Sequence, residues 1–451
     1  MNWLSYLLAF AVLLGIVVVI HEFGHFWVAK LCGIKVLRFS VGFGQPILSR
    51  RYGADQTEWA LGAFPLGGYV KMLDEREAPV AANELHRAFN RQTVWKRIAV
   101  VVAGPVANLL LAILLFWFLF IVGVPGSKPI LGEIVKGSAA QRAGFVSGEK
   151  IIAIDGDPIL TWHEVGWAIT TRMANSAGIE VKTEDAAGQI RERMLDSSGL
   201  TDQDLESDFV AKLGLTRSRP SVEIVEVLAD SPALRAGLQA KDEVLSIKHK
   251  RLSGGVQEFI QTIQANVDKP LEIEVKRGGA VIQIVATPQA AADRGNAKGV
   301  IGAKVGEVDA PALRSTASYG PLVALSKALA KTWDMSWLSL KSLARMLIGE
   351  LSVKNLSGPV TIANYAGQSA QMGIIQFISF IAVISISLGV LNLLPIPLLD
   401  GGHLMYYIAE IIKGSPVSEK IMEAGQQIGL VLLIGLMVIA FYNDINRLIT
   451  G

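Results

Sequence analysis

Two histidines and a glutamate follow an apolar run near the start of the chain, in the stretch VVVIHEFGHFW, residues 17–27. Residues four apart lie on one face of a helix, so His21 and His25 can present both imidazoles to one ion. Glu22 lies beside that face, where its carboxylate could take a proton from a water molecule. Two imidazoles and a carboxylate are typical of a zinc site that leaves one position open for water. The spacing predicts a catalytic metal site.

The surroundings of this motif favour function over chance. The chain has six histidines, and a pattern HExxH would arise by accident with a probability of roughly a few in a thousand. A charged residue inside a membrane span costs about 2.5–3.5 kcal/mol and is normally retained for function. The alternative is a polar helix end that reaches the membrane surface.

A catalytic zinc site needs a third protein ligand, and a second stretch, GVLNLLPIPLLDGGHLM, residues 389–405, offers candidates. Pro395 and Pro397 break a helix there, which frees backbone groups that only a protein-lined or water-lined cavity tolerates at membrane depth. Asp400 and His403 follow, and by residue type either could bind the ion. The two glycines between them suit a close backbone approach.

The composition indicates a membrane protein with water-exposed domains. Of the 451 residues, 51% are hydrophobic and 18% are charged. The net charge of +2 argues against nucleic acid as a partner. The single cysteine, Cys32, cannot form an intramolecular disulfide, and we expect it to be an inert apolar residue rather than a ligand.

Four apolar segments reach or approach the roughly 20 residues that cross a bilayer. They are residues 3–20, 98–122, 374–394 and 428–441. The first has no basic residue before its core and no small-residue cleavage site after it, so we interpret it as a retained anchor. Lysines and arginines concentrate between the first two segments, which predicts that this loop is cytoplasmic and that both termini lie outside.

The long segment between the second and third spans contains an internal repeat. Residues 138–154, SAAQRAGFVSGEKIIAI, align without gaps on residues 231–247, SPALRAGLQAKDEVLSI. Each copy predicts a short helix ended by glycine, a charged turn and an apolar strand. The pattern resembles PDZ domains, which bind extended peptides by strand addition. Peptide capture and a role as spacer or steric cover both remain open.

The predicted fold class is a polytopic α-helical membrane protein with four transmembrane helices, membrane-associated β-hairpins and two periplasmic PDZ-like α+β domains. An amphipathic region before the third span could lie on the membrane surface or pack against the repeats. The expected segments are the first span with HExxH (1–27), a cytoplasmic hairpin region (28–97), the second span (98–122), PDZ-like domains (123–216 and 217–308), the amphipathic region (309–373), the third span (374–397), a cytoplasmic loop (398–427) and the fourth span with the carboxyl terminus (428–451).

HEFGH in the first span, together with NLLPIPLLDGG in the third, resembles the site-2 protease family of intramembrane metalloproteases. The resemblance covers nearly the whole chain. It implies a zinc ion held by His21, His25 and Asp400, with Glu22 as general base. It assigns no ligand role to His403, which we expect to be structural.

Other stretches resemble the family less sharply. AGPVAN, residues 103–108, places a Gly-Pro pair and Asn108 in the second span, where the asparagine could be a polar group near the site or a packing residue. By resemblance, Asn392 contacts substrate backbone or a developing oxyanion. VGFGQPIL and GAFPLGGYVKM predict β-hairpins, and by resemblance the segment around Gly68 and Tyr69 supplies an edge strand to substrate. Residues 355–367 resemble the segment before the third span, with no function assigned.

The resemblance implies regulated intramembrane proteolysis in a bacterial inner membrane, near the cytoplasmic face. The substrate would be a pre-trimmed single-span membrane protein of the anti-sigma factor class, or a remnant signal peptide. Two rival classes remain. An inactive PDZ-bearing adaptor would hold peptides and would not need Glu22. A transporter would use the broken second and third spans as an ion path, but it gives the tandem insert no place.

Overall fold

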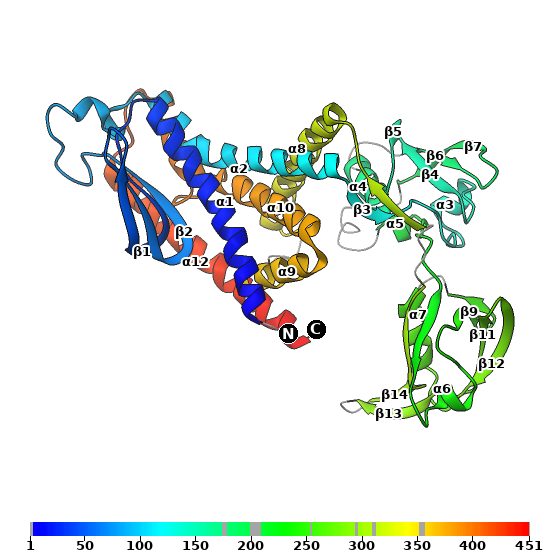
Figure 1. Cartoon of the computed structure of the whole chain (residues 1–451). Helices are drawn as coiled ribbons and strands as arrows, with labels where there is room; N and C mark the ends of the chain where they lie inside the picture. Colours follow the sequence, from blue (N-terminus) through cyan, green and yellow to red (C-terminus); the bar gives the residue numbers. More distant parts are fainter. Residues whose placement is uncertain are drawn as a thin grey trace. The chain divides into compact units, whose positions relative to one another are not determined.

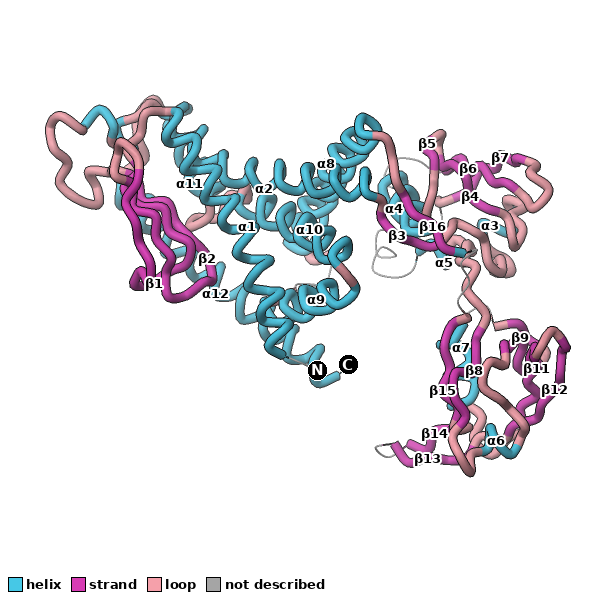
Figure 2. The backbone as a smooth tube through the Cα atoms, in the orientation of Figure 1, coloured by secondary structure: helices cyan, strands magenta, loops and turns pink. Residues whose placement is uncertain are grey.

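The structure is a computed structural model, and it describes residues 3–173, 178–198, 209–252, 255–293, 296–308, 313–350 and 357–450. The chain divides into two compact units, one formed by Met1–Val124 with Ser318–Gly451 and the other by Pro125–Ala317. The first unit contains the long helices, and the second is built mainly from short strands (Figure 1, Figure 2). The first unit is discontinuous in sequence, so its two halves must meet in space.

Four helices among the described residues are long and apolar enough to cross a membrane, and they correspond to the four predicted spans. Three of these helices extend beyond the predicted apolar runs, whereas the third span ends at Asn392, two residues before its predicted end. The first helix continues to Leu31, so HEFGH lies inside it. The helices of this unit are α1 (Trp3–Leu31), α2 (Val94–Val122), α8 (Pro321–Leu347), α9 (Pro359–Met372), α10 (Ile374–Asn392), α11 (Asp400–Lys413) and α12 (Glu419–Thr450), with 3-10 turns at Leu85–Arg87 and Phe89–Arg91.

The first two spans touch through their backbones. Gly24 of α1 faces Ala103 of α2 so closely that a Cβ at Gly24 would lie 2.3 Å from the Ala103 carbonyl oxygen. Such contacts stabilise helix pairs in lipid, where apolar burial offers little driving force. α2 also packs against α10 through a core that includes Ala112, Phe116 and Ile386. The helical face that carries the histidines is therefore pressed against α2.

One sheet follows α1, rather than the separate hairpins that the sequence predicts. Its two long strands, β1 (Val36–Tyr52) and β2 (Thr57–Met72), pair antiparallel with several register shifts. Residues 36–41 pair on one side with residues 68–72 and on the other side with residues 58–61. Residues 58–61 in turn pair with residues 48–51 on their far side. The strands fold back at their glycines, a long-range arrangement that alternation alone does not specify. Residues 68–72 lie at an edge, because no described strand pairs with their other side.

An aspartate of the last span caps α9. Asp444 of α12 accepts backbone hydrogen bonds from Gly358 (2.9 Å), Val360 (2.9 Å) and Thr361 (3.1 Å) at the start of α9, and it is 1% exposed. A carboxylate at a helix N-terminus satisfies free N–H groups and complements the helix dipole. The family-like segment 355–367 thus ties α9 to α12, although residues 355 and 356 lie outside the described part of the chain.

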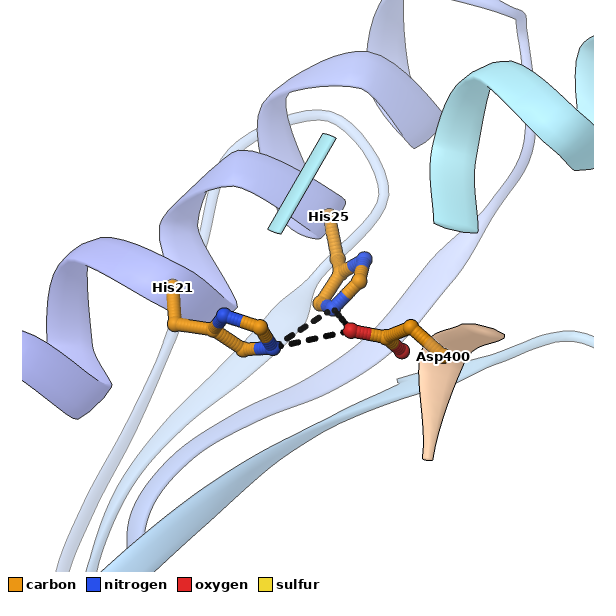
Figure 3. A group of neighbouring side chains, drawn as sticks. All are labelled: His21, His25 and Asp400. Carbon is orange, nitrogen blue, oxygen red and sulfur yellow. Dashed lines mark hydrogen bonds and ion pairs between the residues drawn. The ribbon is translucent and has the colours of Figure 1, made fainter. Parts of the chain in front are cut away.

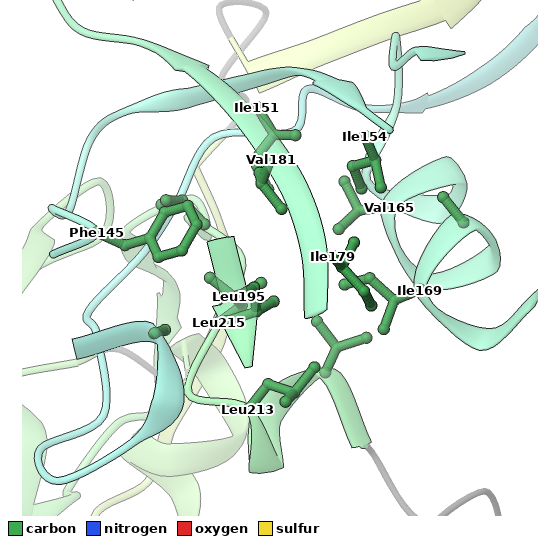
Figure 4. Packing of buried hydrophobic residues seen from close by; sticks show 14 of the residues in the cluster. Phe145, Ile151, Ile154, Val165, Ile169, Ile179, Val181, Leu195, Leu213 and Leu215 are labelled. Carbon is green, nitrogen blue, oxygen red and sulfur yellow. The ribbon is translucent and has the colours of Figure 1, made fainter. Parts of the chain in front are cut away.

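The two largest sheets of the second unit, among the described residues, each have their own hydrophobic core. The first sheet has the order β5-β4-β6-β7, and its core is shown in Figure 4; the second has the order β12-β11-β9-β8-β15, with β10 beside β9. The elements are β3 (Val124–Ser127), α3 (Ala139–Arg142), β4 (Lys150–Ile154), β5 (Asp157–Pro158), α4 (Trp162–Met173), β6 (Gly178–Glu184), β7 (Ile190–Asp196), α5 (Phe209–Lys212), β8 (Val222–Val227), α6 (Pro232–Arg235), β9 (Glu243–Ile247), β10 (Lys250–Arg251), α7 (Gly255–Gln264), β11 (Leu271–Arg277), β12 (Ala280–Ala286), β13 (Gln289–Asp293), β14 (Asn296–Val300), β15 (Ala303–Glu307) and β16 (Arg314–Ala317).

Both repeats form the local structure that the sequence predicts. The hydroxyl of Ser138 accepts the N–H of Gln141 (3.2 Å), and that of Ser231 accepts the N–H of Leu234 (3.1 Å), so each serine caps a short helix. A glycine with positive φ follows each helix, and an apolar strand comes next. Equal sequence patterns therefore give equal local folds.

Each repeat also buries a carboxylate at the aligned position before its strand. In the first repeat, Arg193 donates to both oxygens of Glu149 (2.8 and 2.9 Å). In the second, Arg277 donates to both oxygens of Asp242 (2.6 Å each), and the N–H of Gln239 adds a third bond (2.8 Å). Burial opposes the ionisation of Asp242, but these hydrogen bonds hold its pKa below the usual value.

The variant Asp242→Asn should weaken the second repeat without changing its shape. At neutral pH we expect the opening free energy of amides in β9 and β11, measured by hydrogen exchange on the full chain, to fall by about 1–3 kcal/mol, because Asn accepts weaker bonds from Arg277. The folded-state pKa lies below the unfolded value of about 3.9, so this contribution is complete above that pH and is lost as the pH falls through the folded-state pKa.

The matched control is Glu243→Gln, because Glu243 lies 4.0 Å from Lys276 in a more exposed pair. Such a pair contributes at most about 1 kcal/mol. An equal loss in both variants at pH 7 would contradict the assigned role of Asp242.

Candidate metal centre

Three side chains from the two ends of the chain converge on one point. His21 and His25 project from α1, and Asp400 is the first residue of α11 (Figure 3). The Nε2 atoms of the histidines are 3.2 Å apart, and Oδ2 of Asp400 lies 3.1 Å from that of His21 and 3.4 Å from that of His25. Among the described residues, this is the one group of His, Cys, Asp and Glu side chains that could hold a metal ion.

The spacing of these three atoms fits a tetrahedral ion. Zinc bonds to histidine nitrogen and carboxylate oxygen are about 2.0–2.2 Å long, so two ligand atoms of a tetrahedron lie about 3.3–3.5 Å apart. The three observed separations form a nearly equilateral triangle close to that size. An ion above this triangle would keep a fourth position for water or substrate.

The second span makes room for the histidines and orients one of them. A Cβ at Gly104 would lie 2.3 Å from Nε2 of His25 and 2.9 Å from Cε1 of His21, so only glycine fits there. Nδ1 of His25 lies 2.8 Å from the carbonyl oxygen of Val100. Sequence reasoning singled out AGPVAN as a feature of this span, but it missed Val100, because a backbone carbonyl carries no sequence signal.

The break after the third span places Asp400. α10 ends at Asn392, the prolines follow, and Leu398 adopts a positive φ of 87°, which is strained for a leucine. A Cβ at Gly401 would lie 2.1 Å from the carbonyl oxygen of Leu394, and one at Gly402 would lie 2.5 Å from that of Ile396. The close backbone approach predicted for the two glycines is therefore present, and it packs the first turn of α11 onto the broken segment.

A cavity of about 910 Å³ surrounds the cluster. All seven predicted site residues line it, including Glu22, Asn392, Gly68 and Tyr69. Glu22 lies against the edge segment, because a Cβ at Gly68 would lie 3.0 Å from Cγ of Glu22. The candidate base, the three candidate metal ligands and the edge segment therefore line the same cavity.

His403 lines the same cavity but is not part of the metal-binding group. Burial lowers its pKa, so its imidazole is neutral at neutral pH. The expectation that it is not a ligand agrees with this placement. Cys32 is partly buried against the core around Phe26 and Val36 and lies outside the group as well.

Ion pairs that sequence reasoning missed line another part of the cavity. Arg97 of α2 donates to Glu410 of α11 (2.6 Å), and Arg76 donates to Asp74 (2.5 Å). Arg97 and Glu410 come from distant segments, and the sequence showed the two arginines only as part of a basic loop. The cavity therefore joins the metal-binding group to a charged, polar region.

Membrane-length helices around a buried cluster of two histidines and an aspartate indicate a membrane metalloprotease, and comparison with known proteins agrees. The model of peptidase family M50 matches residues 9–436, so this chain belongs to peptidase family M50. The predicted family and protease class are confirmed.

Individual relatives align over nearly the whole chain. It is 39% identical over 447 residues to the Regulator of sigma-E protease RseP of Salmonella typhimurium, covering 98% of each chain. It is 38% identical to the protein of that name from Escherichia coli, covering 99% of this chain and 100% of the relative. It is 41% identical over 435 residues to a Xylella fastidiosa protein whose name includes the words zinc metalloprotease, covering 96% of each. That name agrees with the predicted enzyme class and cofactor.

The variant Gly104→Ala should displace the imidazoles, because its methyl group would overlap His25. We expect roughly 10- to 100-fold weaker metal binding, the range found when the surroundings of metal ligands are altered. Metal content by elemental analysis of the purified chain checks this. The control is Gly15→Ala in α1, where an added Cβ meets no atom within 4 Å. Full metal content in Gly104→Ala would contradict this prediction, because it would show that the imidazoles can make room for the added methyl group without losing the ion.

Proposed function

We propose that this protein is an intramembrane zinc protease that hydrolyses a peptide bond within the membrane-spanning segment of a single-span protein. The observation that carries the proposal is the convergence of His21, His25 and Asp400 at separations of 3.1–3.4 Å beside Glu22, in one cavity among membrane-length helices. The three would hold zinc, and Glu22 would be the general base.

The proposed chemistry divides the work between the ion and the protein. When bound, zinc polarises a carbonyl group and lowers the pKa of a water molecule to about 7. Glu22 takes the proton from that water and returns it to the leaving amine. The polar lining of the cavity admits the water that hydrolysis consumes, which hydrocarbon would exclude.

The edge segment supports a way to present the substrate. A helix hides its peptide bonds in its own hydrogen bonds, so a scissile segment must unwind, and its free N–H and C=O groups then need partners. Residues 68–72 offer an unpaired strand edge beside Glu22. We infer that Gly68 and Tyr69 help to bind substrate there as an added strand.

Asn392 ends the third span and lines the cavity with Glu22. Its amide can donate to a substrate carbonyl, and such a donor is worth most when charge develops on that oxygen. We therefore assign it to substrate backbone or to the oxyanion.

The basic loop between α1 and α2 supports a cytoplasmic position for residues 28–97 and an outside position for both termini. Cleavage would then occur near the cytoplasmic face of a bacterial inner membrane. The second unit would lie in the periplasm. Its two repeats have the helix, turn and strand pattern expected of PDZ-like domains, and we assign 123–216 and 217–308 to them.

We favour a steric role for these PDZ-like domains, because their loops specify no ligand. They would exclude substrates with bulky outer domains until another protease has trimmed them. The names of the relatives refer to regulation of sigma-E, which supports a substrate of the anti-sigma factor class. The alternative function is an inactive adaptor, which would have no use for the cavity around Glu22.

The experiment that separates these functions compares wild type with Glu22→Gln. We expect cleavage of a purified single-span substrate without its outer domain, in detergent, to fall by about 10²- to 10⁴-fold, because a general base is removed. Zinc content on the same samples should not change. The control is Glu77→Gln, another carboxylate that lines the cavity. Equal cleavage by wild type and Glu22→Gln would favour the adaptor.

The variant Asn392→Ala should lower the cleavage rate by about 10²- to 10³-fold if its amide binds the oxyanion, with zinc retained. Its control is Leu391→Ala, because the neighbouring side chain is 41% exposed on the helix surface. Equal cleavage rates in Asn392→Ala and Leu391→Ala would contradict a role for Asn392 in binding the oxyanion.

A further inference from the structure

The side chain of Asn108 in α2 lies against a proposed metal ligand with its hydrogen bonding incomplete. The residue is fully buried, and its Nδ2 lies 3.2 Å from Nδ1 of His21. Its Oδ1 is buried too, and no donor among the described residues reaches it. A buried amide oxygen without a partner is costly and uncommon, so the orientation of this amide needs a physical explanation.

The other histidine shows what the site requires. Nδ1 of His25 lies 2.8 Å from the carbonyl oxygen of Val100. A carbonyl can only accept, so Nδ1 carries the proton of the neutral ring and Nε2 keeps its lone pair. Nε2 is the atom that faces Asp400. The hydrogen bond at one ring nitrogen therefore prepares the other nitrogen to bind an ion.

His21 has the same requirement, because its Nε2 also faces Asp400. If the amide of Asn108 donated from Nδ2 to Nδ1 of His21, Nδ1 would carry no proton. The proton of the neutral ring would then be on Nε2, where it would prevent that nitrogen from binding an ion. The oxygen and nitrogen of an amide are told apart by their hydrogen-bond partners. Turning the amide of Asn108 by half a turn sets Oδ1 against Nδ1–H and gives the buried oxygen its missing donor.

We propose that Asn108 is a positioning residue whose Oδ1 accepts the Nδ1–H of His21 and so fixes the tautomer and ring orientation in which Nε2 binds zinc. Val100, Gly104 and Asn108 follow each other at four-residue spacing on one face of α2. They respectively orient His25, make room for both rings and orient His21. The hydroxyl of Ser385 in α10 donates to the backbone oxygen of Asn108 (2.8 Å), which fastens this part of α2 to the third span.

This inference rests on the proposed zinc site, and its test is zinc affinity of the full-length protein in detergent, measured by competition with a chelator. The variant Asn108→Leu removes the acceptor, and we expect roughly 10- to 100-fold weaker binding. The variant Asn108→Asp keeps an acceptor of the same shape, and it should bind zinc within a few-fold of wild type at pH 7.5.

Two results would overturn the proposal: wild-type affinity in Asn108→Leu, or an equal loss in Asn108→Leu and Asn108→Asp. The packing control is Ser385→Ala, which removes the neighbouring hydroxyl and leaves the amide in place. We expect it to keep wild-type affinity, and a loss equal to that of Asn108→Leu would show that affinity follows helix packing instead. A wild type that binds no zinc would contradict the proposed function itself, and this inference with it.

A spectroscopic readout reports the tautomer without activity. In the metal-free protein, the ¹⁵N shifts of the His21 ring should show a protonated Nδ1 in wild type and in Asn108→Asp. The Asn108→Leu variant should lose this preference. A wild-type ring protonated at Nε2 alone would overturn the proposal.

Discussion

The close contact between the backbones of α1 and α2 is the constraint on which the site depends. Imidazoles on an apolar helix need a neighbour that covers them, leaves room for their rings and offers polar groups. Gly24 and Gly104 remove the side chains that would hold the helices apart. α2 can then bring the Val100 carbonyl and the Asn108 amide to the rings. The same few residues of α2 thus pack this helix against α1 and orient the two imidazoles.

The position of Asp400, the third candidate ligand, depends on the break in the chain after α10. A helix that continued past Asn392 could not turn back toward α1, so the chain breaks at its prolines and restarts at Asp400. The positive φ of Leu398 has a cost of about 1–3 kcal/mol, and tight packing of the following glycines holds it in place. Placing a carboxylate at the first residue of a helix also sets its negative charge against the positive end of the helix dipole.

Local signals in the sequence predicted the main parts of this structure. Apolar length identified the four spans, the HExxH spacing placed two histidines on one helical face, and the repeat predicted short helices ended by glycine. The double pairing of residues 36–41 was not predicted, because register in a bent sheet depends on contacts between distant segments. The cap that Asp444 provides to α9 was missed for a similar reason. A lone aspartate near the chain end gives no sign of the helix terminus that it will meet.

The residues of the metal-binding group lie far apart in the sequence, and this separation has a consequence for biosynthesis. His21 and His25 leave the ribosome early, whereas Asp400 follows after the whole second unit has been made. At ordinary rates of translation, that delay is on the order of a minute. A chain that stops before residue 400 therefore carries two of the candidate ligands and lacks the third. The metal-binding group is complete only after Asp400 has been synthesised.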